Sequence, residues 1–179
     1  MKQKVFKRHE LKYIINEQQM NKLIEILGLY MDEDKYYKST IRNIYYDTPN
    51  FLLIRTSIEK PEYKEKIRIR SYKLVSGDDE VFVELKKKYK KVVYKRREVL
   101  PYTAARLFLD QKIRPNDEQI TKEIEYTLDF YNNLKPAIFL SYDRLAYIDK
   151  ADKNLRITFD RNIMWRDYDL DLTKDAYGD

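Results

Sequence analysis

Residues 64–70 read KEKIRIR, a run in which charged and apolar side chains alternate. Successive side chains of a β-strand point to opposite faces, so Lys66, Arg68 and Arg70 share one face and the two isoleucines share the other. Residues 80–88, EVFVELKKK, repeat the pattern and place Glu84 among their cations. The two segments predict neighbouring strands, each with one apolar face and one cationic face.

Alternation of the same kind extends along most of the chain. Further strands are predicted at residues 7–14, 40–46, 91–100, 137–148 and 155–160, and six of the seven predicted strands carry a charged face. The charged members outside the first two segments are Arg8, Glu10, Lys12, Lys95, Arg97, Arg144, Arg156 and Asp160.

Helical spacing appears between these strands. Asn16 and Gln19 form a capping pair in front of a predicted amphipathic helix over residues 16–29, and a second such helix is predicted over 116–131. Shorter helices are predicted at 49–58 and 103–110. Residues 161–179 are acidic and lack apolar periodicity, so we expect an α+β domain over 1–160 followed by a loop or tail over 161–179.

Composition removes several classes of site. The chain has no cysteine, one histidine and three glycines, which excludes thiolate catalysis, multi-histidine metal sites, a P-loop and a dinucleotide-binding fingerprint. No secretory signal or membrane-spanning run is present, which favours a cytoplasmic location. Residues 60–100 contain 14 Lys or Arg against 7 Asp or Glu. That surplus predicts a polyanionic partner: nucleic acid, anionic lipid or a phosphate polymer.

The charged strand faces have two interpretations. A strand with one apolar and one charged face is usually half-exposed, with its charges in solvent. Two features favour an interior position instead: the faces are dominated by cations, and Glu10 and Glu84 sit among them. If the sheet closes with these faces inward, the apolar faces must pack outward beneath the helices at 16–29 and 116–131. Because buried like charges repel, we expect the interior to be wet and wide.

Seven stretches resemble the bacterial form of the polyphosphate polymerase domain of the vacuolar transporter chaperone (VTC) family, within the triphosphate tunnel metalloenzyme superfamily. They are RHELKY (8–13), NIYYDTP (43–49), YKEKIRIRSY (63–72), VFVELKKK (81–88), VYKRR (93–97), SYDR (141–144) and LRITFD (155–160). Each is short, but together they span most of the chain.

The resemblance implies an antiparallel triphosphate-tunnel β-barrel with amphipathic helices packed outside, whose closing strand we expect beyond residue 179. The implied activity is transfer of the ATP γ-phosphoryl group to a polyphosphate chain, by an ATP-dependent polyphosphate polymerase that uses Mn²⁺ or Mg²⁺. The implied partners are ATP, polyphosphate, inorganic phosphate or pyrophosphate, and a membrane protein; nucleic acid is not expected.

The same resemblance assigns roles to individual residues. Catalytic roles are expected for Lys12, Arg68, Arg70, Lys86 and Arg144. Phosphate binding is expected for Lys66, Lys95 and Arg97, and the strand pattern adds Arg8 and Arg156. Glu10 and Glu84 are the expected metal ligands. One departure is that hydrolytic members of the superfamily begin Glu-x-Glu-x-Lys, whereas this chain has Arg8-x-Glu10-x-Lys12.

Two other functions stay open at the level of sequence. A triphosphate or polyphosphate hydrolase, or a polyphosphate sensor, would use the same scaffold if a carboxylate in the tunnel positioned water. A nucleic-acid-binding β-domain is suggested only by the basic segment 60–100, which contains the run Lys86-Lys-Lys-Tyr-Lys-Lys91.

Overall fold

Seven strands form one antiparallel sheet in this computed structural model, which describes residues 4–179 apart from the side chains of Phe6 and Arg8. Across the sheet the strands are β1 (Val5–Arg8), β5 (Val92–Pro101), β4 (Glu80–Tyr89), β3 (Tyr63–Ser71), β2 (Met31–Asp47), β6 (Lys135–Asp149) and β7 (Arg156–Arg166). The helices are α1 (Glu17–Tyr30), α2 (Leu52–Ile58), α3 (Tyr102–Gln111) and α4 (Gln119–Tyr131). The α+β prediction is confirmed.

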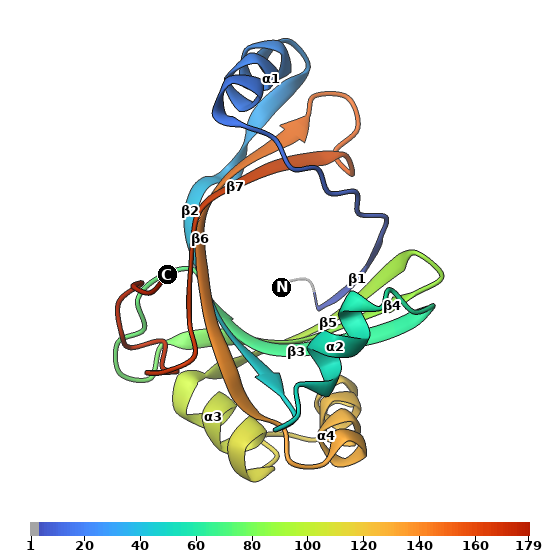
Figure 1. Cartoon of the computed structure of the whole chain (residues 1–179), viewed down its shortest axis with the longest axis vertical. Helices are drawn as coiled ribbons and strands as arrows, with labels where there is room; N and C mark the ends of the chain where they lie inside the picture. The colour runs from blue at the N-terminus through green and yellow to red at the C-terminus, as the bar shows by residue number, and fades with distance from the viewer. Residues whose placement is uncertain (1–3) are drawn as a thin grey trace.

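The apolar faces of the central strands form the main core, and they face away from the cations. Ile67 and Ile69 of β3 are fully buried, as are Val83 and Leu85 of β4. They belong to one cluster with Phe108 and Leu109 of α3 and with Ile124 and Leu128 of α4. Figure 1 shows these two helices beneath the convex side of the sheet. The predicted arrangement, with the core outside the curved sheet, is confirmed.

Helix α1 covers the other end of the sheet. It begins as predicted: the Asn16 side chain accepts from the Gln19 amide, and the Gln19 side chain accepts from the Asn16 amide. Leu27 then packs with Leu145 and Phe159 in a second, smaller core. The helix continues to Tyr30, one residue beyond the predicted end at residue 29.

The sheet curls strongly but does not close. Within residues 4–179, β1 and β7 are the two edge strands, and no ladder joins them. In Figure 1 the extended segment 9–16 leaves β1 and crosses between the two edges to reach α1. Within residues 4–179 the structure is therefore an open form of the barrel that was expected.

Two strands are several residues longer than the sequence predicted, whereas the first, predicted over 7–14, is β1 over Val5–Arg8. β2 begins at Met31 rather than Thr40, because its first residues pair with the far end of β6. β7 continues to Arg166, so residues 161–166, predicted as loop or tail, belong to the sheet. The Arg166 side chain is almost completely buried, and its guanidinium donates to the carbonyls of Asp169, Asp175 and Tyr177. These bonds fold the acidic end of the chain back onto β7.

Helix α2 starts later than predicted. Its first residue is Leu52 rather than Pro49, and Leu53 is its buried residue. Asp47 supplies the cap from a distance, with its carboxylate accepting from the amides of Leu53 and Ile54. No helix within the described residues is long and apolar enough to cross a membrane.

Candidate functional site

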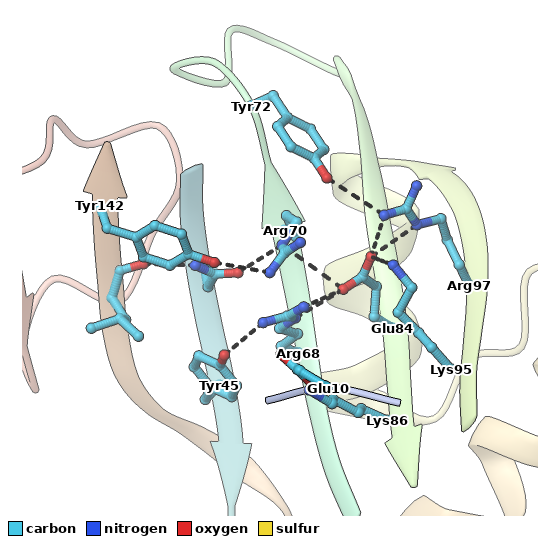
Figure 2. Close-up of polar contacts among 12 residues, drawn as sticks. Glu10, Tyr45, Arg68, Arg70, Tyr72, Glu84, Lys86, Lys95, Arg97 and Tyr142 are labelled. Atoms are coloured by element: carbon cyan, nitrogen blue, oxygen red, sulfur yellow. Dashed lines mark hydrogen bonds and ion pairs between the residues drawn. The ribbon is translucent and has the colours of Figure 1, made fainter. Parts of the chain in front are cut away.

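One buried carboxylate, that of Glu84 on β4, lies at the centre of a group of cations (Figure 2). Arg68 approaches Oε2 with Nε at 2.9 Å and Nη2 at 2.6 Å. Arg97 approaches Oε1 with Nε at 2.8 Å and Nη2 at 2.6 Å. Lys95 Nζ lies 3.3 Å from Oε1, and Arg70 Nε lies 3.8 Å from Oε2. We call these five residues the Glu84 cluster.

Strand register brings the cluster together. Arg68 on β3 and Arg97 on β5 both lie directly opposite Glu84 in the two ladders that flank β4. Arg70 lies two residues after Arg68 in β3, and Lys95 lies two residues before Arg97 in β5. Both share the face of the cluster because side chains alternate. The cationic face predicted from residues 64–70 therefore points to the concave side of the sheet, away from the apolar face that packs on α3 and α4. Figure 2 shows the side chains of the cluster.

The two arginines of β3 are also held by neutral partners on β2 and β6. Arg68 Nη1 donates to the Tyr45 hydroxyl at 2.6 Å. Arg70 donates from Nε to Asn43 Oδ1 at 3.0 Å and from Nη2 to the Tyr142 hydroxyl at 3.2 Å. Both guanidinium groups thus have fixed orientations before any ligand arrives, which lowers the cost of ordering them on binding.

A second ion pair lies beside the cluster. Lys86 Nζ donates to Glu10 Oε2 at 2.7 Å, and Lys12 Nζ is 3.9 Å from the other oxygen of Glu10. Glu10 and Lys12 sit in the extended segment after β1 rather than in a strand. Lys66, opposite Lys86 in the β3–β4 ladder, shares the face that carries the cluster and is half-buried.

The pKa values record a surplus of positive charge. Burial would raise the pKa of Glu84, but its four cationic neighbours outweigh burial and lower it well below its usual value. Burial lowers the pKa of Lys95 to about 7; the nearby arginines add to this effect and Glu84 opposes it. Burial also lowers the pKa of Lys86, with Arg68 and Lys12 contributing. When Lys95 is protonated, four positive charges surround one negative charge.

The cluster is drier than the sequence suggested. The side chains of Arg68, Arg70, Lys95 and Arg97 are only 6–14% exposed. The expectation of a wet, wide interior rested on repulsion among unpaired cations, and Glu84 relieves part of that repulsion from within. The arrangement can bind an anion with several oxygens, because the guanidinium forks already hold a carboxylate in the way they would hold phosphate oxygens.

A VTC domain family model matches residues 7–178. The chain belongs to the VTC domain family. No protein with a curated description matches it in sequence. Among solved structures, a Bacillus halodurans protein described as a "putative adenylate cyclase" is similar, with a TM-score of 0.50 and 18% sequence identity over 88% of this chain and 79% of the other. This likeness concerns the fold, which is of the triphosphate-tunnel type.

The VTC domain brings together most of the residues singled out from the sequence. Arg68, Arg70, Lys95 and Arg97 form the cluster, and Lys66 and Lys86 adjoin it. Arg144 is connected to the cluster through Tyr142, which accepts from Arg70. The Arg144 guanidinium forms two 2.6 Å bonds with Asp160 and lies over the Tyr142 ring at 5.2 Å.

Three of the expected binding residues stand apart from the cluster or outside the described side chains. Arg156 is paired with Asp34 at the far end of β7 and is 44% exposed. Lys12 is 81% exposed. Arg8 pairs through its backbone with Val93, and its side chain is outside the described residues.

The expected metal ligands do not fit a divalent cation as they are arranged. Both oxygens of Glu84 accept from cations, and the four positive charges around it would repel a metal ion. Glu10 is engaged by Lys86. Within residues 4–179, no three His, Asp or Glu side chains gather closely enough to hold a metal ion.

Sequence reasoning gave no role to Asn43 and Tyr45, which orient the arginines. Their signal was present in the period of β2: Asn43 and Tyr45 alternate with the buried residues Ile44 and Tyr46. The alternation in β2 is incomplete, because Arg42 shares the face of Ile44 and Ile41 shares the face of Asn43. It is therefore a weaker signal than the period in β3 and β4. Tyr142 lies in the stretch SYDR (141–144), but its bond to Arg70 depends on pairing across the sheet.

Proposed function

We propose that this VTC domain transfers the γ-phosphoryl group of ATP to a polyphosphate chain held along its cationic face. Family and fold support a role in triphosphate or polyphosphate chemistry. The observation that carries the finer proposal is the surplus of buried, pre-oriented positive charge around Glu84. Phosphoryl transfer needs mainly positioning of the phosphates and stabilisation of their negative charge. The cationic side chains around Glu84 can supply both.

The reaction requires no protein nucleophile. An oxygen of the terminal phosphate of polyphosphate, or of inorganic phosphate or pyrophosphate, attacks the γ-phosphorus of ATP. The bond from that phosphorus to the β–γ bridging oxygen breaks, and its electron pair leaves with ADP. The acceptor grows by one phosphate, and no proton has to be removed from the attacking oxygen because it is already anionic. In this proposal Arg68 and Arg97 hold the equatorial oxygens, where charge is spread in the transition state.

Transfer to phosphate is favoured over transfer to water by the state of the carboxylates. A hydrolase needs a group that accepts a proton from water or orients it. Glu84 is saturated by cations and its pKa is strongly lowered, so it is a poor proton acceptor. Glu10 is bonded to Lys86. A hydrolase or a non-catalytic polyphosphate sensor on the same fold is the alternative.

Mn²⁺ or Mg²⁺, expected from the resemblance, receives no protein ligand in this proposal. The cationic side chains bind and orient the phosphates, and the ion is included in the assay because it neutralises phosphate charge in solution. The membrane-protein partner suggested by the resemblance is likewise left to experiment.

The test is incubation of the purified chain with γ-labelled ATP and MnCl₂, with and without pyrophosphate as acceptor. We expect labelled phosphate chains of increasing length, with one ADP released per phosphate added. Arg68→Gln should lower the rate about 10²-fold or more, the usual cost of removing one donor to developing charge. Arg68→Lys keeps the charge but loses the planar guanidinium fork, so its rate should lie between that of Arg68→Gln and that of the unaltered chain.

Arg114→Gln is the matched control, since Arg114 pairs with Glu125 on the outer surface, away from the cluster. It should retain full activity. Release of labelled free phosphate without chain growth would show that the domain is a hydrolase and would overturn the proposal. Tight binding of tripolyphosphate with no turnover of ATP would replace it with a sensor.

A further inference from the structure

A hollow of about 650 Å³ lies where β3 begins and the β4–β5 hairpin turns. Its lining contains five lysines, one carboxylate and one proline: Lys60, Lys64, Lys88, Lys90, Lys91, Glu62 and Pro61. It includes the end of the basic run noted in the sequence. The Glu84 cluster uses none of these residues, so the hollow has no role in the site described so far.

The hollow continues the line of cations that leads to the cluster. In the β3–β4 ladder, Arg68 lies opposite Glu84, Lys66 opposite Lys86, and Lys64 opposite Lys88. These three pairs lie on one face because they are two residues apart. At a rise of about 3.3 Å per residue, Lys64 stands ~13 Å along the strand from Arg68. Cations therefore line the strand from the cluster to the hollow.

Positive charge in the hollow is poorly compensated. Glu62 is the only carboxylate in the lining, and it is 3.9 Å from Lys90 with both side chains more than 60% exposed. Burial lowers the pKa of Lys64, and repulsion from Lys88, Lys66 and Lys60 lowers it further. A polyanion would relieve this repulsion.

The backbone of the lining is strained in three places. Lys60, Lys90 and Lys91 have φ values of +55°, +46° and +69°, a region that side-chain-bearing residues rarely adopt. Lys90 and Lys91 form the two-residue turn between Tyr89 and Val92, where positive φ at both positions favours Asn-Gly. Lysine at both positions costs stability and places two charges at the rim, which suggests that the charges have a use.

We propose that this lysine-lined hollow is a secondary binding site for the phosphate chain, the port through which long polyphosphate extends out of the cluster. The inference rests on the proposed function, because the chain must also occupy the cluster. It adds that the domain distinguishes long chains from short ones, since only a long chain reaches from Arg68 to Lys90.

Phosphate polymer fits this hollow better than nucleic acid does. No aromatic side chain is among its lining residues within the described structure, so it offers no platform on which bases could stack. The cations are all lysines, which supply compact charge to a flexible chain rather than planar recognition of one group. A lipid headgroup would leave the line of cations between the hollow and the cluster unused.

The test compares the affinities of tripolyphosphate and long-chain polyphosphate for the full chain, by titration at fixed salt. The main variant is Lys90→Asn with Lys91→Gly, which removes two charges while giving the turn its preferred residues. We expect a raised Tm, unchanged tripolyphosphate affinity, and a loss of about five- to tenfold in long-chain affinity, as two screened charges would give.

A second variant, Lys60→Asn, removes a charge from another residue of the lining and also suits a positive φ. It should lower long-chain affinity in the same direction. Lys22→Gln with Lys174→Gln is the charge-matched control, since both lysines are exposed and neither lines the hollow. It should leave both affinities unchanged.

The outcomes separate the two proposals. If tripolyphosphate does not bind the unaltered chain, the proposed function fails and this inference fails with it. If tripolyphosphate binds but the hollow variants keep full long-chain affinity, only the port is wrong. If oligo-dT binds as tightly as long polyphosphate and the hollow variants weaken both, the hollow is a nucleic-acid site and the polyphosphate port is overturned.

Discussion

Glu84 is a single side chain on which the electrostatics of the site depend. Its carboxylate is fully buried, and its two oxygens accept from Arg68, Arg97 and Lys95. Without a ligand it offsets part of the repulsion among the cations. In the proposed function, incoming phosphates compete with it for the same donors. In the structure as it stands, the residue acts as the internal counter-ion of the cluster.

Glu84→Gln tests that role. The substitution keeps the shape but removes the charge, so four cations lose their counter-ion and the free energy of unfolding should fall by about 3–5 kcal/mol. Tripolyphosphate should then raise the Tm of the variant more than that of the unaltered chain, because it supplies the missing negative charge. Thermal melts with and without tripolyphosphate measure both effects. Equal ligand-induced shifts in the two proteins would show that Glu84 and the ligand do not share donors.

The control for this experiment is Glu62→Gln. Glu62 is 65% exposed, and its ion pair with Lys90 is 3.9 Å long. Its loss should change the free energy of unfolding by less than about 1 kcal/mol, as for other exposed pairs.

Lys95 gives the site a pH dependence. Its pKa is lowered to about 7 by burial and by the neighbouring arginines, and a bound polyanion would raise it. Below pH 7 Lys95 is protonated with or without ligand, so affinity is greatest there. As pH rises above 7, binding must take up a proton, and the affinity for tripolyphosphate should fall until the pKa of the bound state is passed.

The measurement is the tripolyphosphate affinity from pH 6 to pH 9. The terminal phosphates of tripolyphosphate also titrate in this range and change the affinity with pH. Lys95→Gln shows that change alone, because the variant lacks the titrating lysine. The difference between the two profiles above pH 7 is the predicted effect. Parallel profiles would place the titrating group elsewhere.

At the scale of elements, β3 and β4 serve the core and the site at once. Ile67 and Leu85 pack against α3 and α4. Arg68, which follows Ile67, and Glu84, which precedes Leu85, meet on the opposite face. A slip of one residue would turn the cations into the core and the isoleucines into the site. The hydrophobic core thus determines the register of the site, because the burial of its apolar face strongly disfavours any other pairing.

Asp47 ties α2 to the end of β2. Its carboxylate is 7% exposed and accepts from the amides of Thr48, Leu53 and Ile54. Asp47→Ala should lower the free energy of unfolding by about 1–2 kcal/mol, since it leaves the first amides of the helix without an acceptor. The midpoint of urea unfolding measures this. Asn50→Ala, which removes only a bond from the Thr48 hydroxyl, should cost less.

At the scale of the whole molecule, the open sheet leaves the cations of neighbouring strands to hold the ligand. Affinity should therefore depend on charge rather than on a metal bridge. We expect the affinity for tripolyphosphate in excess EDTA to stay within about threefold of its value in MgCl₂, a difference below about 0.7 kcal/mol. It should weaken steeply as NaCl is raised, because screening acts on every cation along the strands.

Isothermal titration in each buffer tests this prediction. Binding that disappears in EDTA and returns with Mg²⁺ would mean that carboxylates outside the described arrangement hold a metal. It would also reopen the roles expected of Glu10 and Glu84.

Much of the site could be predicted from alternation alone. Period two in residues 64–70 and 80–88 assigned the inward face correctly, and with it Arg68, Arg70, Glu84 and Lys86. The same period placed the isoleucines beneath helices. Alternation does not report where along the sheet a residue lies. Arg156 and Arg68 were therefore both predicted to lie in the site, although Arg156 is at the far end of β7.

By itself, the sequence determined the strands, the two faces of each, the capped start of α1 and the cationic character of the interior, because these follow from local periodicity and composition. Only the tertiary structure decided which cations meet, that Glu84 is their counter-ion rather than a metal ligand, and that Asn43, Tyr45 and Tyr142 orient the arginines. The reason is physical: those contacts depend on register between strands distant in sequence, which long-range pairing sets and no local pattern records.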